Sequence, residues 1–339
     1  RPKLSGALVS NQLLMADLAP LIGADSNTQQ KARGGESKQP AGKVLPVEEF
    51  RTERWRDMDA DVEFTGKRIV QSADLPFTDL YTHVVLSDGV LKLEPLRFGV
   101  AGGKLDAQIN LNGRDTPLQG RAKLTARNFK LKQLFPTFEP MKTSFGELNG
   151  DATITGTGNS VAKLLGTANG DLKMIINDGA ISRSLMEIAG LNVGNYVVGK
   201  IFGDEDVKIN CAAADLGIKN GLASTRLFVF DTENAIIYID GTANFATERL
   251  DLKITPESKG FRVFSLRSPL YVRGTFAHPD AGVEAVPLLL RGAGMVALGV
   301  IAGPAAGLLA LIAPSGGEPN QCAPLLQQMQ QGKVPKTVK

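Results

Sequence analysis

The sequence predicts a mainly β protein. Its strands follow one another as a long antiparallel meander that forms a curled, groove-like sheet, with a few short helices and a C-terminal apolar helical segment. Apolar and polar residues alternate in many short runs, which is typical of strands with one apolar and one polar face. Pairs such as Asn-Gly and Asp-Gly separate the runs, and these residues tolerate the positive φ of hairpin turns. Gly is abundant, at 37 of 339 residues, and aromatic residues are only 6%, which suits a chain that turns often.

The composition excludes several classes of protein. The chain is 43% hydrophobic and 22% charged, so it is too apolar to be disordered throughout. Its net charge is +3, and no basic domain predicts nucleic-acid binding. Two His and two Cys leave little room for a His-based metal or acid–base site. We therefore expect no metal, no cofactor, no nucleic-acid partner and no enzymatic activity.

The first residues are expected to continue from a longer protein. The chain starts at Arg1 without a signal-peptide pattern, and residues 1–23 are interpreted as the end of a preceding repeat. Residues 24–44 are predicted to be a flexible linker. Between 24 and 43 no aromatic or β-branched apolar residue occurs, so burial cannot offset the entropy of ordering.

Residues 45–280 are predicted to form the β-groove region. In the clearest run, 104–112, every odd residue is apolar and every even residue is polar. The same alternation recurs at 91–93, 121–127, 151–155, 206–211 and 250–255. Turn signals such as Asn112-Gly113 and Asn220-Gly221 separate these runs, so hairpins are favoured over βαβ units.

Helical patterns are few and short. Residues 159–166 have a cap-like start and a Gly stop, and 182–190 are similar, with Ser182 as a candidate N-cap. Residues 196–202 continue that pattern, and 128–135 give a further candidate. These helices cannot cover all the apolar rows of the strands. Either two sheets face each other as a sandwich, or one sheet curls and leaves its apolar face for a ligand.

The apolar residues of these strands are the candidate ligand-facing residues. They share a place on the apolar side of an alternating run. The set is Leu91, Leu93, Leu96, Phe98, Leu105, Ala107, Ile109, Leu111, Ile154, Leu172, Met174, Ile209, Leu250, Leu252 and Ile254.

Residues 281–316 are predicted to be an apolar, Gly-rich helical segment, followed by a polar tail at 317–339. Residues 292–314 carry no charge and, at ~20 residues, are long enough to cross a bilayer. Their Gly residues and Pro304 disfavour a solitary span. Three alternatives remain: packing on the end of the sheet, contact with a membrane, or a true span. Cys211 and Cys322 either form a disulfide or remain separate thiols.

Two motifs that imitate ligand sites fail on inspection. Residues 292–297 match a loose dinucleotide fingerprint, but no βαβ pattern surrounds them. Residues 57–61 imitate the opening of a calcium loop. Val62 stands where that loop needs Gly, and Arg68 stands where it needs Glu, so the coordination shell is incomplete.

A series of short motifs resembles the AsmA family of bacterial envelope proteins. The motifs are Asp88–Phe98 with Gly102-Gly103, Gly146–Gly150, Gly156–Ser160, Ala168–Gly170, Phe264–Leu270 and Val272–Phe276. The resemblance extends from about Pro46 to Gln330. It implies an inner-membrane protein whose N-terminal anchor is missing from this sequence and whose large remaining part is periplasmic. It also implies a relation to TamB-like, bridge-like lipid carriers built from repeating β-grooves.

The function implied by the resemblance is non-enzymatic envelope biogenesis. An apolar β-groove would shield phospholipid acyl chains between the inner and the outer membrane, and residues 292–314 would be a candidate contact with the outer membrane. The alternative is a structural or regulatory factor in outer-membrane protein assembly or in protein targeting to the membrane.

Overall fold

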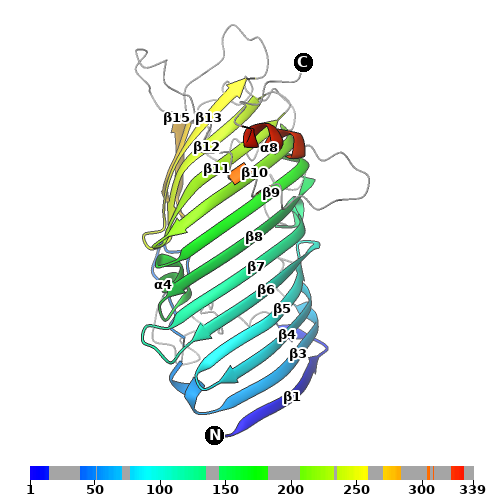
Figure 1. Cartoon of the computed structure of the whole chain (residues 1–339), viewed down its shortest axis with the longest axis vertical. Helices are drawn as coiled ribbons and strands as arrows, with labels where there is room; N and C mark the ends of the chain where they lie inside the picture. The colour runs from blue at the N-terminus through cyan, green and yellow to red at the C-terminus, as the bar shows by residue number, and fades with distance from the viewer. Residues whose placement is uncertain are drawn as a thin grey trace.

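The computed structural model describes residues 1–14, 39–50, 52–70, 77–134, 145–181, 207–232, 235–258, 270–283, 304–305, 308 and 322–331. Within these residues fifteen strands form one sheet, in which β3 to β15 lie side by side in chain order. Figure 1 shows the strands stacked along the long axis of the molecule, each inclined to that axis. The predicted mainly β meander with few short helices is therefore confirmed.

The elements have the following bounds. The strands are β1 (Lys3–Ser10), β2 (Leu13–Leu14), β3 (Asp59–Val70), β4 (Phe77–Ser87), β5 (Val90–Val100), β6 (Gly103–Asn112), β7 (Gln119–Lys130), β8 (Phe145–Thr157), β9 (Asn169–Ile181), β10 (Val207–Lys219), β11 (Leu222–Thr232), β12 (Ala235–Asn244), β13 (Arg249–Ser258), β14 (Leu270–Thr275) and β15 (Pro279–Val283). The described helices are the 3-10 helix η2 (Thr52–Arg56) and the α-helices α3 (Leu131–Leu134), α4 (Val161–Gly166) and α8 (Cys322–Gln330).

The sheet is mixed, whereas the sequence predicted an antiparallel meander. From β3 onward each strand pairs antiparallel with its sequence neighbours, but β1 and β2 both pair parallel with β3. Two strands joined by a tight hairpin must be antiparallel, and only a long connection permits parallel pairing. More than forty residues separate β1 from β3, so this pair is not bound by the hairpin constraint.

The side chain of Asp61 on β3 forms hydrogen bonds with Lys3 of β1 and His83 of β4. These contacts, the His83 hydrogen bond foremost, lower the pKa of the Asp61 carboxyl.

The predicted helix at 159–166 is confirmed as α4. Ser160 is its N-cap, and the Ser160 hydroxyl accepts a hydrogen bond from the backbone N–H of Lys163 at 3.2 Å. Within 128–135 the structure forms α3, at 131–134. The helices predicted at 182–190 and 196–202 lie outside the described residues. The proposed boundaries of the five segments stay predictions.

The strand register places apolar residues on one face of the sheet. Residues directly opposite each other in an antiparallel pair share a face. Ile109 of β6 lies opposite Leu93 of β5 and Ala122 of β7, and Ala122 lies opposite Ile154 of β8. The same pairing links every strand from β3 to β14, so the apolar face is continuous across the described sheet.

The opposite face is polar and carries cross-strand ion pairs. These join Arg97 to Asp106 at 2.7 Å, Arg127 to Asp151 at 2.7 Å, Arg226 to Asp215 at 2.8 Å and Arg273 to Asp251 at 3.0 Å. Most of these side chains are more than a third exposed, so each pair adds little stability. Their effect is to oppose a slip of the strand register, because a slip would turn charged side chains onto the apolar face.

The best-buried cluster lies on this second face, at the C-terminal end of the sheet. Here α8 packs against β9 to β12, and in Figure 1 it lies in front of β9 and β10. We call it the α8 cluster; it comprises Ile175, Cys211, Ala213, Leu227, Val229, Ile236, Tyr238, Ala305, Leu308, Cys322, Leu325, Leu326 and Met329. Because side chains on both faces are apolar there, runs such as 211–214 and 227–230 lose the polar–apolar alternation.

A disulfide joins α8 to the sheet. Cys211 of β10 and Cys322 at the start of α8 are bonded across a sequence separation of 111 residues. Of the apolar segment at 292–314, the described residues Pro304, Ala305 and Leu308 lie here, and both Ala305 and Leu308 are fully buried in the α8 cluster. The rest of that segment lies outside the described residues.

Reduction of the disulfide is expected to loosen α8 from the sheet. A nine-residue helix is marginal by itself, and the chain-entropy model gives a crosslink of this span about 4–5 kcal/mol. Limited proteolysis with mass mapping should show faster cleavage around α8 after reduction. The Cys211→Ser/Cys322→Ser double variant should be cleaved fast in either condition. Equal cleavage of oxidised and reduced wild-type protein would contradict this account.

Candidate functional site: the apolar face of the sheet

The candidate site is the apolar face of the described sheet, which extends across β3 to β14. We define it by the residues that the register places on one side of β3 to β14. They are Ala60, Val62, Phe64, Leu80, Val84, Leu86, Leu91, Leu93, Leu96, Phe98, Leu105, Ala107, Ile109, Leu111, Ala122, Leu124, Ala126, Ala152, Ile154, Leu172, Met174, Ile176, Ala212, Ala214, Leu216, Ile218, Ala223, Phe228, Phe230, Ile237, Ile239, Ala243, Leu250, Leu252, Ile254, Leu270 and Val272. None of these side chains can ionise.

Most large side chains of the apolar face are half-buried. Leu93, Ile109 and Leu172 all fall in this intermediate class. Neighbours within the same sheet cover their flanks, which accounts for partial burial without a second layer. Ala107 is 3% exposed because it is small and sits between larger residues. A sandwich core would instead bury the large residues fully.

The structure brings fourteen of the fifteen sequence-predicted ligand-facing residues together on the apolar face. Ile209 is the exception. It lies opposite Gly179 of β9, two positions from Cys211, on the face that carries α8, and it is fully buried. Polar and apolar residues alternate in the run 206–211, so the sequence correctly indicated a strand. Alternation does not tell on which face of the sheet the apolar residues of that strand lie.

Several apolar-face residues were missed by the sequence reasoning. Val62, Leu124, Phe228 and Ile237 are examples, and each sits opposite an apolar partner on the next strand. The alternation around Leu124, in the run 121–127, was a usable signal. Around Phe228 and Ile237 no signal was available, because the α8 cluster makes the other face apolar as well.

The described helices cover the apolar face only near one rim. This rim, which we call the turn rim, is formed by the hairpin turns that follow β4, β6, β8, β10 and β12. There the side chain of Leu164 from α4 packs over Gly120 and Leu111, and Trp55 from η2 lies over Gly113. A Cβ built on Gly120 would lie 2.9 Å from Leu164, so these glycines permit the close contact.

Successive turns of the turn rim are hydrogen-bonded to one another. Backbone N–H groups of Gly113, Gly158, Gly221, Phe245 and Phe276 donate to carbonyl oxygens of the preceding turn, at 2.8–2.9 Å. The acceptors are Gly89, Leu118, Ala168, Gly221 and Glu248. The rim is thus a continuous hydrogen-bonded row that runs the length of the sheet.

Residues 39–50 and 52–56, which we call the strap, lie along the turn rim. The backbone N–H of Phe50 donates to the carbonyl of Asn159 at 2.7 Å, and that of Ala162 donates to the carbonyl of Pro46 at 2.9 Å. Further toward β4, Arg56 donates to the carbonyl of Arg114 at 2.5 Å. The strap therefore contacts, in a single course along the rim, the turns that connect the strands from β4 to β9.

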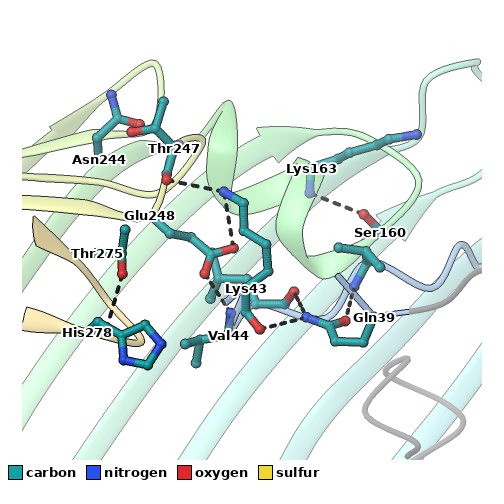
Figure 2. Close-up of polar contacts among 12 residues, drawn as sticks. Gln39, Lys43, Val44, Ser160, Lys163, Asn244, Thr247, Glu248, Thr275 and His278 are labelled. Atoms are coloured by element: carbon teal, nitrogen blue, oxygen red, sulfur yellow. Dashed lines mark hydrogen bonds and ion pairs between the residues drawn. The ribbon is translucent and has the colours of Figure 1, made fainter. Parts of the chain in front are cut away.

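Glu248 anchors the other end of the strap (Figure 2). Its carboxylate accepts a hydrogen bond from the backbone N–H of Val44 at 2.6 Å and pairs with Lys43 at 3.8 Å. The Lys43 ammonium also donates to the carbonyl of Thr247 at 3.1 Å. Glu248 is 2% exposed, and a buried carboxylate is stable only when it is paired and hydrogen-bonded.

A shallow depression lies elsewhere, beside the turn between β10 and β11. Its lining mixes the apolar residues Ile218 and Leu222 with polar ones, among them Lys219, Asn220, Ser224, Arg226 and Asn244. Arg226 is engaged by Asp215 and Asp171, so it is not free to bind a ligand. Burial raises the pKa of the Asp215 carboxyl, and the charge of Arg226 opposes that rise. This arrangement is a structural ion-pair network.

In the part of the chain that the structure describes, no cluster of three His, Cys, Asp or Glu is arranged to hold a metal ion. Among the same residues, no helix combines the length and the apolar character that a membrane crossing needs. The apolar face is therefore the candidate functional surface.

Comparison with known proteins agrees with the motifs in the sequence. The model of the AsmA family matches residues 1–228, more than half of the chain. The chain belongs to the AsmA family. It is 56% identical over 336 residues to AsmA family protein YhjG of Escherichia coli (strain K12), covering 97% of this chain.

The chain spans about half the length of that AsmA relative, 49% of it. No solved structure matches the chain. Membership of the AsmA family suggests an envelope-related function.

Removal of the Glu248 carboxylate is expected to detach the strap. Glu248→Ala leaves the Val44 N–H and the Lys43 ammonium without this acceptor, which costs roughly 1–3 kcal/mol. Urea unfolding followed by circular dichroism measures the loss. Glu49→Ala is the matched control, because Glu49 forms an exposed ion pair with Lys163 and its loss costs about 0–1 kcal/mol. Equal losses in the two variants would show that Glu248 does not anchor the strap.

Proposed function

We propose that this AsmA family protein is a non-enzymatic lipid-transfer protein of the bacterial envelope. Its apolar face holds phospholipid acyl chains while the headgroups stay in water. The observation that carries the proposal is the continuity of the apolar face across β3 to β14, with large side chains left half-buried in the described structure.

The energetic argument concerns the acyl chain. Exposure of a 16-carbon chain to water costs on the order of 12 kcal/mol, at ~0.8 kcal/mol per CH₂. A surface of Leu, Ile, Val and Phe side chains removes most of that cost wherever the chain lies along it. Apolar contacts are non-directional, so a lipid can move from one strand to the next without breaking specific bonds.

The length of the apolar face suits a path rather than a single pocket. Neighbouring strands lie about 4.8 Å apart, so twelve strands from β3 to β14 give a path of roughly 50 Å. The ionisable residues that the register places on the side of the apolar face in β9 and β10, Asp178 and Lys208, lie toward one end of these strands. A charge in the middle of the face would be a barrier to an acyl chain. The strap and the turn rim hold the strand ends together and so fix the curvature that a lipid meets.

The proposal extends to the compartment and the partners. The protein would be the periplasmic part of an inner-membrane-anchored protein, with phospholipid as cargo. Residues 292–314 would be a contact with the outer membrane, and Ala305 and Leu308 show that part of this segment is also used for packing.

A second candidate function is assembly of outer-membrane proteins. The observation that favours it is the edge of the sheet at β1. In the described residues β1 pairs only with β3, and Leu4, Leu8 and Val9 are 53%, 55% and 61% exposed. Such an edge can receive a strand of a client protein.

A charge on the apolar face is expected to abolish lipid binding. Ile109→Asp places a carboxylate among Leu93, Ala122 and Leu111, and native mass spectrometry of the purified chain should show at least a several-fold loss of bound phospholipid. Asn110→Asp is the matched control, because the next residue of β6 points to the polar face, opposite Lys92 and Arg121. The control should retain wild-type lipid.

A crosslinking experiment covers the case in which Ile109→Asp fails to fold. A photoreactive amino acid at position 109 should form adducts with phospholipid, and the same residue at position 110 should not. Wild-type protein that carries no lipid, or equal adducts at the two positions, would overturn the proposal. Adducts with outer-membrane proteins at β1 and none with lipid at 109 would favour the assembly function.

A further inference from the structure

The polar face of β5 to β7 carries a strong excess of positive charge. The ionisable residues of these three strands are seven cations and two carboxylates, a difference of +5, whereas the whole chain has a net charge of +3. The cations are Lys92, Arg97, Lys104, Arg121, Lys123, Arg127 and Lys130, and the carboxylates are Glu94 and Asp106. Cations are therefore concentrated on these strands, and the rest of the chain is net acidic.

The register places these cations on one side, behind the apolar face. Lys92 lies opposite Asn110, which lies opposite Arg121, and Arg121 lies opposite Thr155. One step along the same strands, Lys123 lies between Gln108 and Thr153. Lys92 also lies opposite Val85 of β4, so each of these cations faces uncharged neighbours instead of a carboxylate.

Five of the seven cations, Lys130 among them, have no ion-pair partner among the described residues. Arg97 and Arg127 are paired with Asp106 and Asp151. Lys92, Lys104, Arg121 and Lys123 are exposed, and none of them forms an ion pair or a side-chain hydrogen bond with a described residue. Lys92, Arg121 and Lys123 lie around Asn110 and Gln108 of β6, and we call these three residues the cationic patch.

The cationic patch acts as one electrostatic surface. Neighbouring strands lie about 4.8 Å apart and alternate residues of a strand about 7 Å apart, which is within the Debye length of about 8 Å at physiological salt. Arg121 and Lys123 are alternate residues of β7, and Lys92 lies two strands from Arg121, about 10 Å away, so the potentials of these three charges overlap. A concentration of like charge lowers the stability of a protein. Other cations on this face are neutralised by ion pairs, and these are not, so we expect an anionic partner to bind them.

We propose that the cationic patch docks this protein on an anionic phospholipid surface. The patch lies on a broad sheet face, and its direct cross-strand neighbours are Val85, Gln108, Asn110, Thr153 and Thr155. That face of β6 and β7 contains no aromatic residue on which a nucleic-acid base could stack. It also offers no buried aromatic or aliphatic anchor of the kind that dominates protein–protein interfaces. A plane of anionic headgroups needs neither feature and is recognised by charge alone.

Vesicle flotation of the 339-residue chain tests this docking. The chain should float with vesicles that contain about 30% phosphatidylglycerol and not with pure phosphatidylcholine, and added salt should release it. Each patch cation is worth roughly fivefold in membrane partitioning. The Lys92→Gln/Arg121→Gln/Lys123→Gln variant should therefore partition on the order of 100-fold less, three such factors multiplied together.

The matched control neutralises three exposed cations elsewhere. Lys219→Gln/Arg249→Gln/Lys253→Gln removes the same charge on β10 and β13, outside the patch, and should float like wild type. A loss of binding as large as that of the patch variant would show that net charge alone is responsible, and would overturn the proposal. Equal flotation with neutral vesicles would overturn it too.

Two further measurements separate this inference from lipid transfer and from a general affinity for polyanions. The patch variant should keep its copurified phospholipid, and Ile109→Asp should keep its flotation, because the two surfaces are on opposite faces. Double-stranded DNA of equal total charge should compete poorly with the vesicles. If DNA displaces the chain fully and is itself bound through the patch, the membrane assignment is wrong.

Discussion

The fold depends on keeping the strand register in phase across a single sheet. Side chains alternate with a period of two, so a slip of one residue would move a whole apolar row to the wet side. The register from β3 to β14 avoids this across several bulges: in β5, for example, a shift between Leu93 and Leu96 absorbs the extra residue and returns the apolar side chains to the same face. Cross-strand ion pairs on the polar face also oppose a slip of the register.

A single layer places an unusual demand on such a sheet. Sandwiches bury their apolar rows against a second sheet, but here the described helices pack at the turn rim and in the α8 cluster. Curvature must then be maintained by the strand ends. The hydrogen-bonded turns and the strap, anchored by Glu248 at one end and by Arg56 at the other, supply that restraint. The apolar face and its support are therefore built from different parts of the chain.

The two faces of β5 to β7 illustrate how one stretch of sequence carries two surfaces. In β6, Leu105, Ile109 and Leu111 point one way, and Lys104 and Asn110 point the other. The apolar face offers non-directional apolar contacts, which suit acyl chains. The polar face offers positively charged side chains that form no ion pair with a described residue. At β9 to β12 the second face is instead apolar and covered, and a disulfide secures its cover.

The sequence by itself determined the strands, most of the hairpins, a helix with a cap-like start at α4, and the position of fourteen of the fifteen candidate residues on the apolar face, because alternation and turn residues are local signals. It also carried the motifs of the AsmA family. Only the tertiary structure decided that β1 runs parallel to β3, that Ile209 belongs to the α8 side, that Cys211 meets Cys322, and that the strap closes on Glu248. Each of these contacts joins residues distant in the chain, and local pattern carries no information about which distant segments meet.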